Sequence, residues 1–143
     1  MGLDSETFSQ VVVIGGSAGA IDVLSRLVPE MPADIPVPVL VVVHLPADKK
    51  SIVADLLDSK SNVTVTEAQD KEIMKPGHVY FAPPDYHLLV EHNGSLSLSI
   101  EEPVLFSRPS IDVLFETAAD AYKENLIGIV LTGANQDGAN GLK

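Results

Sequence analysis

The residue pattern with the clearest chemical meaning is a Gly-x-Ser-x-Gly turn near the start of the chain. It places Ser17 among the glycines Gly15, Gly16 and Gly19, directly after the apolar run at 11–14. A strand that turns sharply into a helix exposes a serine hydroxyl on a tight bend, and the first N–H groups of the helix can stabilise an oxyanion. Glycines permit the bend and the close approach of a substrate. The pattern therefore predicts a nucleophilic serine at position 17.

Two further polar residues follow apolar runs in the same way. The run at 37–43 ends in His44, and the run at 126–131 leads through a Thr-Gly turn to Asp137. In an open parallel sheet the functional crevice lies outside the carboxyl ends of the strands, so these residues can converge with Ser17. An imidazole can take the proton of a serine, and a carboxylate can fix the imidazole tautomer. The three residue types therefore indicate a Ser-His-Asp triad.

Each of these residues also has a simpler interpretation. A glycine-rich turn can cradle a nucleotide phosphate, with Ser17 as a minor ligand. A dinucleotide site usually carries an acid about 20 residues past the turn, whereas here the second strand ends in His44, and no Gly-Lys-Ser/Thr pair supports a P-loop. Asp137 is well suited to a turn or a helix N-cap. A non-catalytic nucleotide-binding or regulatory α/β module therefore stays open, as does a catalytically weak interaction domain.

The other three histidines lack such a setting. His78, His87 and His92 do not follow long apolar runs and show no metal-ligand spacing with nearby acids. We interpret them as structural or surface residues, and we expect no metal and no cofactor.

The apolar runs predict the class of fold. Short all-apolar segments at 11–14, 37–43 and 127–131 are typical of strands covered on both faces, and helical spacing between the first two makes a βαβ unit. We expect a doubly wound, mostly parallel sheet in a three-layer α/β/α arrangement of the Rossmann or flavodoxin type. A short helix is expected at 51–57 and a short strand at 63–65.

The middle of the chain has a different character. The segments 78–84, 86–91 and 96–100 are strand-like, and Asn93-Gly94 between the last two is a strong hairpin signal. We expect this stretch to be an antiparallel appendage to the sheet. A second helix is expected from Ser110, with Ile111, Leu114, Phe115, Ala118 and Tyr122 on one face.

Composition limits the possible partners and compartments. At 143 residues and 45% hydrophobic content the chain suits one domain, and a formal charge of −11 argues against a surface for nucleic acid or anionic lipid. The absence of cysteine fits a cytoplasmic location. No apolar run approaches the ~20 residues of a membrane span, so we expect no membrane insertion. We expect a tail at 1–10 and a domain at 11–143 that is incomplete at its carboxyl end.

Five segments closely resemble the catalytic domain of the chemotaxis receptor protein-glutamate methylesterases, the effector half of the CheB-type response regulators of the phosphorelay. The resemblance is carried by Val-Ile-Gly-Gly-Ser-Ala-Gly-Ala at 13–20, Val-Val-His-Leu-Pro at 42–46, Pro-Gly-His-Val-Tyr-Phe-Ala-Pro-Pro-Asp-Tyr-His at 76–87, Arg-Pro-Ser-Ile-Asp-Val-Leu-Phe at 108–115 and Gly-Ile-Val-Leu-Thr-Gly-Ala-Asn-Gln-Asp-Gly-Ala at 128–139. The order Ser, His, Asp differs from that of the α/β-hydrolases, in which the acid precedes the histidine.

The resemblance implies that Ser17, His44 and Asp137 form the triad of a serine carboxylic-ester hydrolase. Its reaction would be hydrolysis of γ-glutamyl methyl esters, and deamidation of particular glutamines, on a methyl-accepting chemotaxis receptor, with water as co-substrate. The backbone N–H groups of Ala18 and Ala134 are the expected oxyanion donors. Family members often carry Thr and Met at these two positions. A receiver domain or a fused methyltransferase would be a further partner.

Overall fold

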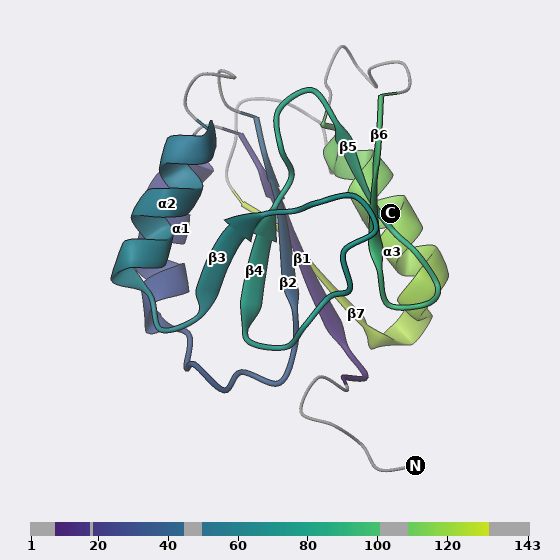
Figure 1. Ribbon diagram of the computed structural model, residues 1–143, viewed down its shortest axis with the longest axis horizontal. Helices are drawn as coiled ribbons and strands as arrows, with labels where there is room; N and C mark the ends of the chain where they lie inside the picture. The colour runs from purple at the N-terminus through teal and green to yellow at the C-terminus, as the bar shows by residue number, and fades with distance from the viewer. Residues whose placement is uncertain (1–7, 18, 45–49, 101–108, 132–143) are drawn as a thin grey trace.

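The computed structural model describes residues 8–17, 19–44, 50–100 and 109–131 (Figure 1). Its centre is a five-stranded parallel sheet in the order β3-β4-β2-β1-β7, and a separate antiparallel hairpin pairs β5 with β6. The strands are β1 (Val11–Gly16), β2 (Val39–Val43), β3 (Thr64–Glu67), β4 (His78–Phe81), β5 (His87–Val90), β6 (Leu96–Ser99) and β7 (Leu126–Val130). The helices are α1 (Ala20–Leu27), α2 (Lys50–Lys60) and α3 (Ile111–Tyr122), with 3-10 turns η1 (Val28–Glu30) and η3 (Lys123–Asn125).

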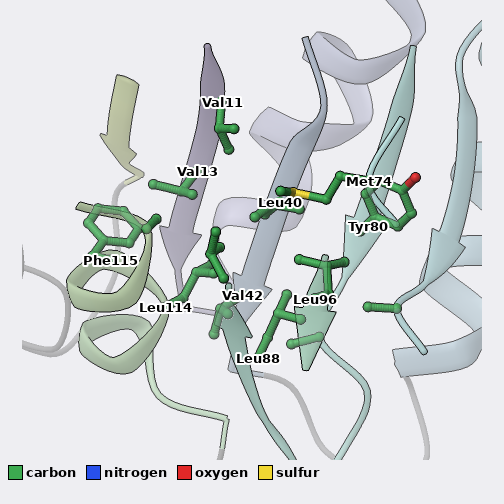
Figure 2. Close-up of a cluster of buried hydrophobic side chains, with 14 of the residues drawn as sticks. Val11, Val13, Leu40, Val42, Met74, Tyr80, Leu88, Leu96, Leu114 and Phe115 are labelled. Atoms are coloured by element: carbon green, nitrogen blue, oxygen red, sulfur yellow. The ribbon is translucent and has the colours of Figure 1, made fainter. Parts of the chain in front are cut away.

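Helices cover both faces of the sheet. In Figure 1, α1 and α2 lie on one side of the strands, while α3 and the β5-β6 hairpin lie on the other. Successive side chains of a strand point to opposite faces, so the all-apolar strands supply two separate cores. Val39, Val41 and Val43 of β2 pack toward α1 and α2. Leu40 and Val42 pack toward α3 and the hairpin, as Figure 2 shows.

The doubly wound α/β architecture with an antiparallel hairpin confirms the fold class expected from the sequence. The three apolar runs form β1, β2 and β7, which are neighbours in the sheet. The hairpin expected around Asn93-Gly94 is present, and Gly94 has a φ of 85°, in the left-handed region that favours glycine.

One element differs from the expectation. The segment 78–81 is not part of the antiparallel appendage but forms β4, which lies inside the main sheet and pairs in parallel with β2 and β3. Both faces of β4 are buried, because Tyr80 belongs to the core under α3 and the hairpin while Val79 and Phe81 belong to the core under α1 and α2. A strand buried on both faces is typical of a parallel sheet.

Helix α3 carries the predicted apolar face. Ile111, Leu114, Phe115 and Ala118 are buried, and the Ser110 hydroxyl accepts from the Val113 N–H at 3.4 Å as the N-cap. In the part of the chain that the structure describes, no helix has the length and apolar character needed to cross a membrane.

Candidate active site

The carboxyl ends of β2, β1 and β7 lie side by side at one edge of the sheet. Of these three strands β1 is the middle one, and its register pairs Gly16 with Val43 of β2 and Gly15 with Val130 of β7. Ser17 and His44 each follow directly after one of the two paired residues Gly16 and Val43. The structure therefore brings Ser17 and His44, 27 positions apart in the sequence, to adjacent strand ends, as the periodicity of the chain predicts.

Two glycine carbonyls hold these strand ends together. The Gly16 carbonyl accepts a hydrogen bond from the His44 N–H at 3.1 Å, and the Gly15 carbonyl accepts one from the Leu131 N–H at 2.8 Å. The Ser17 carbonyl accepts from the Ala20 N–H at 2.9 Å, which closes the turn into α1. We call Gly15 and Gly16 the glycine junction. The backbone positions of Ser17, His44 and Leu131 all depend on it.

The glycine junction is needed for close packing rather than for left-handed backbone. A Cβ built on Gly16 would lie 2.6 Å from the Ala20 Cβ, and one built on Gly15 would overlap the side chain of Ile111. Gly19, the N-cap of α1, has a φ of −64°, which any residue can adopt. The start of α1 therefore approaches the junction from one face of the sheet and the start of α3 from the other.

A Gly16→Ala substitution is expected to destabilise the fold and to lower any activity that depends on Ser17. The added methyl group must push apart Gly16 and the backbone-anchored Ala20, and such overpacking costs about 1 to 3 kcal/mol. Thermal unfolding would measure the loss. Gly19→Ala is the matched control, since its backbone is already helical; equal stability of both variants would contradict this account of the junction.

Three of the predicted site residues, Asp137, Ala18 and Ala134, lie outside the described residues. The end of β7 allows the length of the connection to Asp137 to be compared with the distance to His44. Leu131 lies next to the junction, and Asp137 is six residues further along the chain. Six residues span up to about 20 Å when extended. The distance from β7 to β2 is two inter-strand spacings, or about 10 Å. The connection is thus long enough for Asp137 to reach His44 across the end of β1.

The other histidines are structural or exposed, in agreement with their interpretation from the sequence. His78 is the first residue of β4 and is half-buried. Its ring stacks on Tyr80, and its Nδ1 lies 3.2 Å from the Pro76 carbonyl oxygen. His92 is exposed and lies 3.0 Å from the Asp120 carboxylate. His87 is buried in β5, where its Nδ1 accepts the Ser110 N–H. Within the described ranges, no group of three or more His, Cys, Asp or Glu residues is placed to hold a metal ion.

The fold and the strand-end placement of Ser17 and His44 define an open-sheet α/β protein whose candidate site is of the hydrolase type. The comparisons with known proteins give the family. The model of the CheB methylesterase family matches residues 12–143. The chain belongs to this family.

Relatives and a solved structure agree with this assignment. A putative protein-glutamate methylesterase/protein-glutamine glutaminase of Leptospira interrogans is 48% identical over 134 residues, covering 94% of this chain and 69% of the relative. The protein-glutamate methylesterase/protein-glutamine glutaminase of Symbiobacterium thermophilum is 40% identical over 133 residues, but this chain spans only 37% of its length. The crystal structure of the Thermotoga maritima CheB methylesterase catalytic domain superposes with a TM-score of 0.89 at 38% identity, covering 94% of this chain and 73% of that one.

Proposed function

We propose that this chain is a protein-glutamate methylesterase, which hydrolyses γ-glutamyl methyl esters and deamidates specific glutamines on a chemotaxis receptor. The observation that carries the proposal is the placement of Ser17 and His44 at adjacent, register-paired strand ends in a member of the CheB methylesterase family. The reaction belongs to chemotaxis adaptation, because it restores a negative charge at each hydrolysed receptor glutamate.

The proposed mechanism has two halves. Ser17 Oγ attacks the γ-carbonyl carbon while His44 takes its proton, and the tetrahedral intermediate collapses as His44 protonates the departing methanol. Water then attacks the acyl-enzyme, again with His44 as base, and releases glutamate and free Ser17. A glutamine substrate follows the same course and releases ammonia. The backbone N–H groups of Ala18 and Ala134 are the proposed oxyanion donors, and no cofactor takes part.

Asp137 is the proposed third member of the triad, which holds the tautomer of His44 and stabilises its protonated form. An Asp137→Asn substitution is expected to lower kcat by up to about 10⁴-fold, because asparagine favours the wrong tautomer. Initial rates of ester hydrolysis would measure the loss. Asp120→Asn, at the exposed carboxylate beside His92, is the matched control and is expected to leave the rate unchanged. A normal rate in the Asp137 variant would remove this residue from the triad.

The test of the proposed function is methanol release from methylated chemoreceptor membranes incubated with this protein. Release above the rate of untreated membranes supports the methylesterase. The competing function, a non-catalytic nucleotide-binding module, has one observation in its favour, which is a glycine-rich turn at a strand-to-helix junction. Saturable binding of a nucleotide without hydrolysis of any activated ester would support that function and contradict the esterase.

The location, the division of the chain and the regulatory partner complete the proposal. The substrate is the cytoplasmic helical region of a methyl-accepting receptor, so we propose a cytoplasmic location. Residues 1–10 are a proposed tail and residues 11–143 the catalytic region. A receiver domain or a fused methyltransferase is the proposed regulatory partner, in line with the family's membership among response regulators.

A further inference from the structure

A buried histidine outside the proposed triad holds the start of α3. His87 is the first residue of β5 and is only 2% exposed, and its Nδ1 accepts a hydrogen bond from the backbone N–H of Ser110 at 3.2 Å. Ser110 is the fully buried N-cap of α3. Since the Ser110 N–H donates to Nδ1, that nitrogen carries no proton, and the neutral ring is protonated at Nε2. His87 thus satisfies a buried donor at the helix start, where no intrahelical acceptor exists.

The start of α3 touches the backbone that leads to Ser17. Ile111, the residue after Ser110, lies so close to Gly15 that a Cβ on that glycine would overlap its side chain. Gly15 and Gly16 form the glycine junction, whose carbonyls hold the N–H groups of Leu131 and His44. A continuous chain of contacts therefore runs from the imidazole of His87 through Ser110 and Ile111 to the junction.

A second hydrogen bond between β5 and α3 limits the expected effect of His87 to the first turn of the helix. The Val90 N–H donates to the Thr117 hydroxyl at 3.0 Å, and that hydroxyl lies 3.0 Å from the Val113 carbonyl. This bond holds the middle of α3 against the hairpin independently of His87. Loss of the histidine acceptor is therefore expected to release the first turn of the helix while the rest of α3 stays in place.

We propose that His87 is a positioning residue for the active site, which fixes the first turn of α3 against the glycine junction and thereby sets the geometry of Ser17 and His44. The catalytic part of this inference rests on the proposed function. Catalytic groups have to be held within about 0.5 Å of their productive geometry, and a misplacement of 1 Å costs about 10²-fold in rate. A displacement of about 1 Å at the glycine junction is therefore enough for the expected loss of rate.

Three substitutions of His87 distinguish the effect of its hydrogen-bond acceptor from the effect of the packing of its ring. In His87→Asn the amide oxygen can occupy the place of Nδ1 and accept the Ser110 N–H. In His87→Gln the amide lies near the place of Nε2, and His87→Leu has no acceptor at all. His78→Leu is the matched control, because it removes a half-buried histidine from the first residue of β4, at the end of the parallel strands opposite to His44.

The readouts are kcat and KM for a γ-methyl ester, thermal unfolding, and amide hydrogen exchange at Ser110, His44 and Leu131. The Leu and Gln variants are expected to lose about 10²-fold in kcat with KM close to that of the wild type. Their exchange at all three amides is expected to be faster. The Asn variant is expected to recover most of kcat and of the protection, and His78→Leu to retain both.

The outcomes that overturn the proposal are distinct from failure of the methylesterase itself. Equal kcat in all three variants, recovery by Gln instead of Asn, or the same loss in His78→Leu would each show that His87 does not act through the Ser110 N–H. If the wild type shows no turnover that depends on Ser17, the proposed function fails. Amide hydrogen exchange then still tests whether His87 acts on the glycine junction through Ser110 and Ile111. Unchanged exchange at His44 and Leu131 in the Leu variant would overturn that part of the proposal.

Discussion

Replacing Ser17 by alanine is expected to abolish hydrolysis of a γ-methyl ester and to leave the fold intact. Loss of the nucleophile of a serine triad costs up to about 10⁶-fold in kcat, and the residual rate comes from substrate binding and oxyanion stabilisation. The turn itself should persist, since it is closed by the Ser17 carbonyl and the Ala20 N–H, both of which alanine retains. Initial rates of methanol release, together with a thermal unfolding curve, would measure the two effects.

Ser25→Ala is the matched control for this experiment. Ser25 lies in α1, the helix that follows the turn, and its exposed hydroxyl donates to the Asp22 carbonyl at 2.9 Å. The Ser25→Ala substitution removes a serine hydroxyl only a short distance along the chain from Ser17. The rate of methanol release should stay at the wild-type level. A Ser17→Ala protein that still releases methanol at the normal rate would place the nucleophile elsewhere and contradict the proposed mechanism.

Replacing His44 by alanine is expected to have an effect of similar size. Without the imidazole, Ser17 loses its proposed general base, and removal of the histidine of a serine triad also costs up to about 10⁶-fold in kcat. The hydrogen bond that anchors position 44 to Gly16 uses the backbone N–H, so the strand end should be kept. Single-turnover acylation by an activated ester would show whether the loss falls on the attack by Ser17.

His92→Ala tests whether any histidine beside a carboxylate would serve. His92 lies 3.0 Å from the Asp120 carboxylate and therefore has the partner that a catalytic histidine needs. It follows β5 and pairs with the last third of α3, whereas Ser17 lies beyond the carboxyl end of β1. The rate should be unchanged in this variant. A loss as large as that of His44→Ala would show that the site has been assigned to the wrong edge of the fold.

The local pattern of the chain was sufficient to predict β1, β2 and β7 and the position of Ser17 and His44 at their ends. Long all-apolar runs bury both faces of a strand, and parallel strands in βαβ units bring their carboxyl ends to one edge. The sequence alone places the segment 78–81 in the wrong sheet, because the strand has only four residues and is followed by Ala82 and a Pro-Pro pair. So short a run shows neither which strands it pairs with nor in which direction.

The support of the site by α3 could not be read from the sequence in the same way. The sequence indicates only a structural or surface role for His87, and the structure places it in the interior; nothing at position 87 indicates that its partner is 23 residues away at Ser110. Ser110 carries a local signal as a helix N-cap, and Gly15 carries one as a turn glycine. The contact between Ile111 and Gly15 that joins them has no local signal.

The sequence by itself determined the class of fold and the strand ends at which Ser17 and His44 lie, because both depend on residues close together along the chain. Only the tertiary structure decided that β1 lies between β2 and β7, that β4 completes the parallel sheet, that His87 accepts the Ser110 N–H, and that Ile111 packs against Gly15. Strand order and helix docking depend on which buried faces fit one another across long sequence separations. Local periodicity carries no information about that fit.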